Sequence, residues 1–119
     1  MIKNHGRHLI IDAYGIAVHR LKNRRLIKDL LNNLPKKFKM RLLGKTVVRK
    51  VQSAEYPDWG FSGFALLYES HISLHTWPEE GYVAMDIYSC KDFNDKKISS
   101  YLKKFWRAAK FRTRLVLRG

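Results

Sequence analysis

A serine between a carboxylate and an imidazole stands in the second half of this 119-residue chain, at Glu69-Ser70-His71. A serine hydroxyl becomes a nucleophile when a nearby base accepts its proton, and histidine is the commonest such base in proteins. A second histidine, His75, and the chain's single cysteine, Cys90, follow along the sequence. These residue types could support covalent chemistry at the serine, or metal binding by imidazole and thiol groups.

Two familiar kinds of site fit this spacing poorly. His71 and His75 would face the same way in a helix and could bind a metal ion there, but the residues around them alternate as in a strand, and no third ligand is close. A serine hydrolase is also disfavoured, because no Gly-x-Ser-x-Gly elbow surrounds Ser70. We therefore predict no metal site. Taken one at a time, the histidines and Cys90 would more often be structural, the cysteine as a small buried apolar group.

The hydrophobic pattern predicts the elements that must position these residues. Alternating and β-branched residues predict five strands, over residues 8–14, 46–51, 64–74, 82–90 and 113–117. Apolar residues at helical spacing predict two helices, over residues 18–34 and 96–110. Pro35 would end the first helix, and Asp95 would cap the second. If the segment from residue 70 to residue 75 is extended, His71 and His75 would lie on the face opposite Ser70.

This order of elements, β–α–β–β–β–α–β, predicts an α+β fold. Each helix has one apolar face, so both can pack on one face of a mainly antiparallel sheet and form a two-layer sandwich. A length of 119 residues suits a single domain, over residues 1–119, and 45% hydrophobic residues rule out a disordered basic tail. The second face of the sheet would then need cover or a partner.

Charge is distributed unevenly along the chain. The net charge is +14, to which residues 1–50 contribute +12, residues 51–90 contribute −6 and residues 91–119 contribute +8. A charge of +14 by itself would suggest nucleic-acid binding. The segment 51–90 contains no Lys or Arg, yet it holds the serine, the two closely spaced histidines and the cysteine. The candidate chemistry therefore lies in the acidic part of a basic protein.

The cysteine count and the hydropathy of the chain indicate the cellular compartment in which the protein works. A single cysteine excludes a disulfide framework and points to a reducing compartment. No apolar run approaches the about 18–20 residues of a membrane span, and the first residues lack the apolar core of a signal peptide. We therefore expect a cytoplasmic protein with no membrane partner.

The segment ESHISLHTWPE, residues 69–79, resembles the self-cleaving segment of the prokaryotic-type S-adenosylmethionine decarboxylase proenzyme family. The similarity continues at family-like spacing in four further places: residues 6–9, 60–63, 81–90 and 118–119. Ser62 stands in a match to the family's Gly-x-Ser/Thr-Gly segment, and Cys90 ends the match that includes Asp86. The resemblance thus covers nearly the whole chain and is densest around Ser70.

The resemblance implies the proenzyme of a pyruvoyl-dependent decarboxylase. The Ser70 hydroxyl would attack the carbonyl group of Glu69, and the resulting ester would break by elimination. The chain would be cut into a β chain, residues 1–69, and an α chain, residues 70–119. Ser70 would become dehydroalanine, lose ammonia and end as the pyruvoyl cofactor at the new N-terminus.

The resemblance also implies helpers for processing and for catalysis. His75 would be the base for processing, and Ser62 would assist it. In the mature enzyme the pyruvoyl ketone would form a Schiff base with the amino group of S-adenosylmethionine and take up electrons as carbon dioxide leaves. Cys90 would donate the proton that completes the product, which is the aminopropyl donor for spermidine synthesis.

Three residues would contact the substrate by the same resemblance. Tyr56 and Trp77 would pack against the adenine, and Glu79 would accept hydrogen bonds from the ribose hydroxyls. Tyr56 stands where the family more often has phenylalanine, and Lys91 follows Cys90 where a glycine is common. S-adenosylmethionine carries a sulfonium and an ammonium group, so a segment without Lys or Arg suits it.

Partners and alternatives complete the expectation. The resemblance implies a homodimer of the αβ unit, with sites built at the dimer interface. A pyruvoyl-dependent arginine or ornithine decarboxylase on the same fold stays open, because the motif at Ser70 serves all of them. A basic homologue that binds nucleic acid without processing itself is a third interpretation. Its aromatic residues are not interleaved with basic runs as a stacking surface requires, so nucleic acid fits better as an auxiliary partner.

Overall fold

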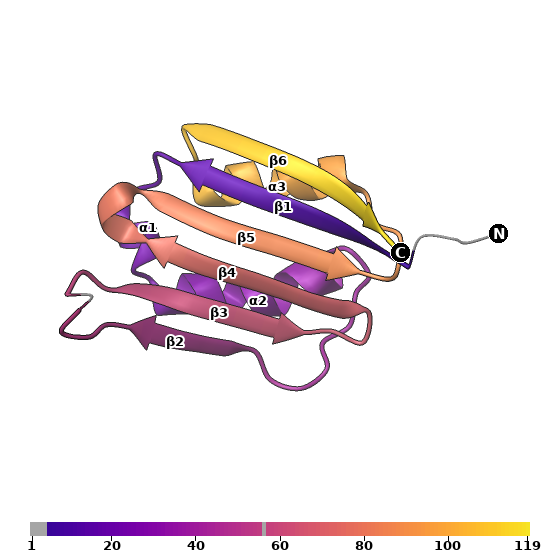
Figure 1. Ribbon diagram of the computed structural model, residues 1–119, viewed down its shortest axis with the longest axis horizontal. Helices are drawn as coiled ribbons and strands as arrows, with labels where there is room; N and C mark the ends of the chain where they lie inside the picture. The colour runs from indigo at the N-terminus through magenta and orange to yellow at the C-terminus, as the bar shows by residue number, and fades with distance from the viewer. Residues whose placement is uncertain (1–4, 56) are drawn as a thin grey trace.

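A computed structural model describes residues 5–55 and 57–119 of the chain (Figure 1). In these ranges six strands form one antiparallel sheet, in the order β2-β3-β4-β5-β1-β6. The strands are β1 (Gly6–Tyr14), β2 (Val47–Val51), β3 (Gly60–Leu66), β4 (Ser70–Trp77), β5 (Tyr82–Ser89) and β6 (Lys110–Arg118). The helices of the same ranges are α1 (Val18–Leu21), α2 (Arg24–Lys37) and α3 (Asp95–Trp106), with a 3-10 turn, η1, at Pro78–Glu80. The predicted α+β class with an antiparallel sheet is confirmed.

The helices α2 and α3 lie behind the sheet in Figure 1, on the same side of it. Each is amphipathic and buries one apolar face: Ile27, Leu30, Leu31 and Leu34 from α2, and Ile98, Leu102 and Trp106 from α3. The strands supply alternate residues to the same layer, among them Leu9, Ile11, Ile72, Leu74, Met85 and Ile87. Burial of such a side chain contributes about 1.5–3 kcal/mol, so this layer holds the fold together. The sheet therefore has a helix-covered face and an open face.

Four details of the predicted helices are wrong, the first being that the second helix ends at Trp106 and not at residue 110, which begins β6. The segment 18–34 is not one helix but two, because Asn23 leaves the helical path and its side chain caps the first turn of α2 from 3.0 Å. Pro35 does not end the helix. It lies in the last turn of α2, where a proline removes only one hydrogen bond of the helix. Asn94, and not Asp95, is the N-cap of α3.

The predicted strand over 64–74 is also wrong. The structure divides this stretch into β3 and β4, which pair antiparallel on either side of a turn at residues 67–69. The N–H of Leu67 donates to the carbonyl group of Ser70 at 2.9 Å and closes the turn. No Gly, Pro or Asn marks these residues, so the sequence pattern gave no sign of a turn. Ser70 consequently stands at the start of β4, not in the middle of a strand.

The open face of the sheet carries both polar and apolar side chains. Val47 and Phe64 lie on it as a cross-strand pair, and Leu66 lies two residues further along β3; all three are 40–46% exposed. Apolar side chains that gather on one exposed face are typical of a surface that binds another molecule. Within the described residues, no helix has both the length and the hydropathy that a membrane span needs.

Candidate active site

The peptide bond between Glu69 and Ser70 lies against the end of β5. The carbonyl oxygen of Glu69 accepts a hydrogen bond from the backbone N–H of Cys90 at 2.9 Å, and Ser70 pairs with Ser89 in the sheet. Cys90 itself is exposed and carries a free thiol. A hydrogen bond to a carbonyl oxygen stabilises the negative charge that develops there during nucleophilic attack. The fold thus brings Cys90 next to Glu69 and Ser70, although Cys90 lies 20 residues after Ser70 in the sequence.

Ser70 has an unusual backbone conformation. Its φ is 156°, a value that residues with a Cβ atom seldom adopt. The turn before it is held in place, because the N–H of Tyr68 donates to the carbonyl oxygen of Arg41 at 3.0 Å and the N–H of Leu67 donates to that of Ser70. A rare conformation of this kind costs about 1–3 kcal/mol and persists only where the surroundings enforce it, often at sites of chemistry.

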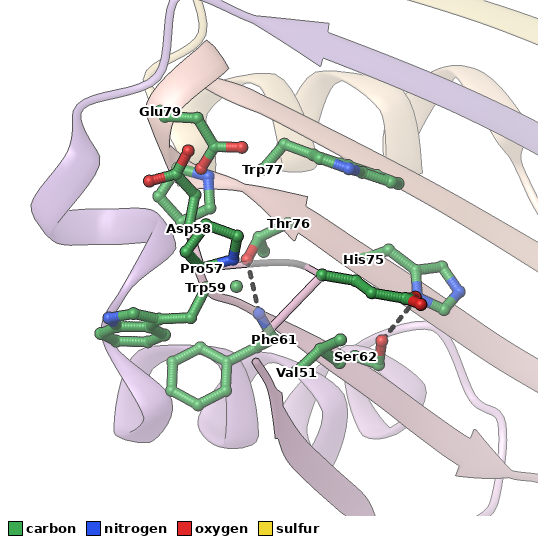
Figure 2. Close-up of a pocket in the computed structure, with 13 residues that line it drawn as sticks. Val51, Pro57, Asp58, Trp59, Phe61, Ser62, His75, Thr76, Trp77 and Glu79 are labelled. Atoms are coloured by element: carbon green, nitrogen blue, oxygen red, sulfur yellow. Dashed lines mark hydrogen bonds between the residues drawn. The ribbon is translucent and has the colours of Figure 1, made fainter. Parts of the chain in front are cut away.

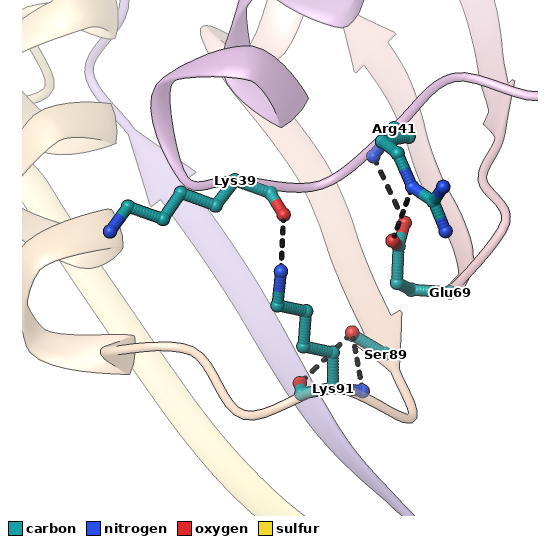
Figure 3. Close-up of polar contacts among 5 residues, drawn as sticks. All are labelled: Lys39, Arg41, Glu69, Ser89 and Lys91. Atoms are coloured by element: carbon teal, nitrogen blue, oxygen red, sulfur yellow. Dashed lines mark hydrogen bonds and ion pairs between the residues drawn. The ribbon is translucent and has the colours of Figure 1, made fainter.

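The side chain of Glu69 is anchored by Arg41 (Figure 3). Its carboxylate accepts the backbone N–H of Arg41 at 3.0 Å and the Nε of the same residue at 3.4 Å, and Glu69 is only 7% exposed. The backbone N–H of Arg41 is the main cause that lowers the pKa of the Glu69 carboxyl below its ordinary value, while burial acts in the opposite direction. The adjoining loop is fixed as well, since the Nζ of Lys91 donates to the carbonyl oxygen of Lys39 at 2.8 Å.

Ser62 and His75 form a second group at the opposite end of β4 (Figure 2). The two residues are paired across β3 and β4, and the Oγ of Ser62 lies 2.8 Å from the Nδ1 of His75. Trp77 follows on the same open face, is 39% exposed, and stacks on Tyr82 with 5.1 Å between the ring centroids. A serine hydroxyl in contact with an imidazole can pass a proton to or from it.

The ring of Tyr82, on which Trp77 stacks, is held in place by a hydrogen bond. Its hydroxyl donates to Oδ1 of Asp12 at 2.5 Å. Burial, together with this carboxylate, raises the pKa of Tyr82 to about 12. The phenol therefore stays protonated at neutral pH and keeps its hydrogen bond.

A cavity of about 380 Å³ opens beside His75 and Trp77 (Figure 2). Its volume lies within the range of about 300–1,000 Å³ that is usual for small-molecule sites. Three carboxylates belong to its wall, from Glu55, Asp58 and Glu79, and among the described residues no Lys or Arg lines it. The three carboxylates favour a cation in the cavity, because each lowers the electrostatic energy of a positive charge nearby. The ammonium groups of Lys22 and Lys50 lie over the ring of Trp59, 4.7 and 4.4 Å from its centroid.

Part of this cavity could not be anticipated from the motifs. The sequence motifs assign no role to Glu55, Asp58 or Trp59, yet these three residues line the cavity. The signal that could have found them is the absence of Lys and Arg from residues 51–90. Tyr56, which the resemblance assigns to the adenine, lies outside the residues that the structure describes.

A single chain does not bring Ser70 and His75 together. The two residues are five positions apart on one extended strand, so roughly 17 Å separates their Cα atoms at about 3.3 Å per residue. A base must come within about 3 Å of the proton that it removes. The predicted nucleophile and its predicted base therefore stand at opposite ends of β4, outside each other's reach within one chain.

Comparison with known proteins places this arrangement in a class. The structure is similar to the crystal structure of the adenosylmethionine decarboxylase from Aquifex aeolicus VF5, with a TM-score of 0.83 and 28% sequence identity. The similarity covers 99% of this chain and 93% of that chain. The fold is thus that of a decarboxylase, a carboxy-lyase. Residues 7–119 match the family described as S-adenosylmethionine decarboxylase, and the chain belongs to this family.

Relatives of known name agree with the assignment. The chain is 38% identical over 119 residues to the S-adenosylmethionine decarboxylase proenzyme of Clostridium botulinum strain Langeland. The matched region covers 99% of this chain and 97% of the relative. The chain is 33% identical over 115 residues to the protein of the same name from Thermoanaerobacter sp. strain X514, which covers 96% and 88%. The resemblance that the sequence motifs indicated is confirmed at the level of the family.

Proposed function

We propose that this protein is a self-processing proenzyme whose mature form decarboxylates S-adenosylmethionine. The observation that carries the proposal is the junction of Glu69, Ser70 and Cys90, where the carbonyl group next to a serine already accepts a hydrogen bond from a backbone N–H. Attack of the Ser70 Oγ on the Glu69 carbonyl carbon would exchange the amide for an ester. Loss of the Ser70 α-proton would then break the bond between Oγ and Cβ. A carboxylate would remain on residue 69 and, after water releases ammonia, a pyruvoyl group on residue 70.

The pyruvoyl group would supply a ketone, which ordinary side chains lack, and with it a sink for the electrons that remain when carbon dioxide leaves the substrate. The chain's own residues bind the substrate and move protons. Cys90 lies next to the cleaved bond and is exposed, so its thiol can donate a proton to the product. Trp77 offers an indole face to the adenine, and Glu79 offers acceptors to the ribose hydroxyls. The carboxylates of Glu55 and Asp58 stabilise the positive charge of the substrate.

The reaction requires residues from two chains, so we infer a homodimer. Ser70 and His75 of one chain are roughly 17 Å apart at the rise of an extended strand, which is too far for proton transfer. A second copy can pack its open face on the first about a two-fold axis that runs between the sheets and across the strands. That arrangement reverses the direction of the partner's β4 and sets its histidine end opposite the start of β4, at which Ser70 lies. It also covers the exposed side chains of Val47, Phe64 and Leu66.

Two measurements test the proposed function. Intact-mass analysis of the purified protein should give two fragments, residues 1–69 and residues 70–119, the second blocked at its N-terminus. The cleaved protein should release carbon dioxide from carboxyl-labelled S-adenosylmethionine. A chain that stays whole in fresh and aged samples would contradict self-processing. A cleaved protein that acts on arginine or ornithine, and not on S-adenosylmethionine, would contradict the substrate.

Arginine and ornithine stay as alternative substrates because both are cationic and suit the same acidic cavity. The exposed indole of Trp77 favours a nucleoside, since a small aliphatic amino acid leaves that surface unused. With S-adenosylmethionine as the substrate, the product would serve as the aminopropyl donor for spermidine synthesis. An affinity for nucleic acid remains a prediction from the net charge of +14.

A further inference from the structure

Three side chains that can bind metals meet on the open face of the sheet, and none of them is assigned a role in processing or catalysis. His8 comes from β1, His71 from β4 and Asp86 from β5, and β5 lies between the other two strands. One ligand atom from each residue lies within 4.8 Å of the other two. His8 and Asp86 are 78 positions apart in the sequence, so local spacing could not reveal the group.

The two imidazoles converge on a single carboxylate oxygen. The Nε2 of His8 is 2.7 Å from Oδ2 of Asp86, and the Nε2 of His71 is 3.2 Å from the same oxygen. In a tetrahedral zinc site each nitrogen or oxygen ligand is about 2.0–2.2 Å from the metal, so two ligands are roughly 3.2–3.6 Å from each other. The three ligand atoms are therefore near the required spacing, and small side-chain rotations would make room for an ion.

Neighbouring side chains hold this group in place. The hydroxyl of Ser73 donates to Oδ1 of Asp86 and leaves Oδ2 to bind a metal ion. Phe64 stacks on the ring of His71, with 5.5 Å between centroids and 23° between planes. The side chains of His8, His71 and Asp86 are 20–32% exposed, so the group is partly shielded from water and still open to an ion. Outer partners of this kind orient metal ligands and increase affinity.

We propose that His8, His71 and Asp86 bind one divalent metal ion of the zinc type. Two imidazole nitrogens and one carboxylate oxygen, with a fourth position open, form a common zinc donor set, whereas Mg²⁺ and Ca²⁺ prefer oxygen ligands alone. The ion joins β1, β4 and β5 and stabilises the sheet one residue beyond Ser70. The sequence-based prediction of no metal site considered His71 with His75, which lies at the other end of β4.

Metal uptake by untagged, chelator-treated protein tests this proposal. We expect one equivalent of Zn²⁺ per chain, and with Co²⁺ the visible bands of a four-coordinate site without the thiolate charge-transfer band that binding at Cys90 would give. His8→Ala and Asp86→Asn should each weaken binding by more than about tenfold. The matched control, His19→Ala, removes an exposed imidazole on α1 and should bind as the wild type does. An excess of Mg²⁺ should not compete.

Thermal unfolding gives a second readout. Zn²⁺ should raise the melting temperature of the wild type by several degrees, because an ion that binds only the folded state stabilises it. It should not raise that of Asp86→Asn, which keeps the shape of the side chain and whose folding circular dichroism verifies. If the wild type takes up no stoichiometric Zn²⁺ or Co²⁺, or if folded variants bind as tightly as the wild type, the residues form only a hydrogen-bonded cluster and the proposal fails. The same measurements on Ser70→Ala separate this result from any failure of processing.

Discussion

The two ends of β4 differ in how far the rest of the chain buries them and holds them in place. At the start of the strand, Glu69 and Ser70 are fixed by backbone hydrogen bonds from two loops, and the carboxylate of Glu69 is buried. At the end of the strand, His75 and Trp77 project from the open face beside a cavity. The first end is thus buried among its own loops, whereas the side chains at the second end are exposed to solvent.

The two ends also differ in charge. Lys39, Arg41 and Lys91 lie around the start of β4, whereas three carboxylates line the cavity at its end. A two-fold dimer that sets one end over the other would bring these opposite charges together, which favours that orientation over a parallel one. If the proposed dimer forms, the two ends of β4 supply complementary parts of one site.

Loss of the hydroxyl at the start of β4 should have the largest effect. Ser70→Ala removes the atom that attacks the Glu69 carbonyl carbon, so we expect no cleavage and no release of carbon dioxide. Intact-mass analysis and the carbon dioxide assay measure both. Ser100→Ala, which alters an exposed serine on α3, is the matched control and should cleave normally. Cleavage of Ser70→Ala at the same bond would show that another nucleophile acts there.

Mixing two inactive chains should restore cleavage. His75→Ala lacks the base and Ser70→Ala lacks the nucleophile, so neither should cleave alone. In a mixed dimer the Ser70→Ala chain lends its His75 to the partner, and we expect the His75→Ala chain to be cut while the Ser70→Ala chain stays whole. Mass spectrometry of the co-expressed chains distinguishes them, and native mass confirms that mixed dimers form. If mixed dimers form and nothing is cut, the two ends of β4 do not act across an interface.

Reversing one charge at the end of β4 should weaken substrate binding. A unit charge about 4 Å away contributes about 1 kcal/mol in water and more in a cavity, so we expect Glu79→Lys to raise the KM for S-adenosylmethionine by about tenfold or more. Glu80→Lys makes the same change one residue on, outside the cavity wall, and should change KM little. Steady-state kinetics on cleaved protein measures both variants. Equal KM values for the two would mean that the acidic cavity does not bind the cationic substrate.

Much of the fold and of the candidate site could be predicted from the sequence, and the features that could not be predicted have physical reasons. Alternation over residues 71–75 correctly places His71 and His75 on the face opposite Ile72, because side chains of a strand alternate. The turn at 67–69 could not be predicted, because it is held by long-range hydrogen bonds such as that between Tyr68 and Arg41. Part of the cavity wall could not be predicted for a similar reason. Its wall includes Asp58, whose position depends on a loop that has no periodic pattern.

The smallest effect we predict concerns stability and should separate the two ends of β4 without any chemistry. In a Ser70→Ala chain, Glu69→Gln should lower the free energy of unfolding by about 1–2 kcal/mol at pH 7, because it weakens the hydrogen bonds from Arg41. His75→Ala at the exposed end should change it by less than about 0.5 kcal/mol. Denaturant unfolding followed by circular dichroism measures these values, and the exposed Asp29→Asn is a control for the loss of one carboxylate.

The stabilising effect of Glu69 should depend on pH in one direction. Its pKa in the folded protein lies below the ordinary value of 4.5, so the folded state favours the charged form. The contribution of the carboxylate is therefore complete above about pH 4.5 and disappears as the pH falls through the folded-state pKa. The gap in unfolding free energy between the parent chain and Glu69→Gln should shrink over that interval. A gap that stays constant as the solution is acidified would mean that the shape of the side chain, and not its charge, fixes the start of β4.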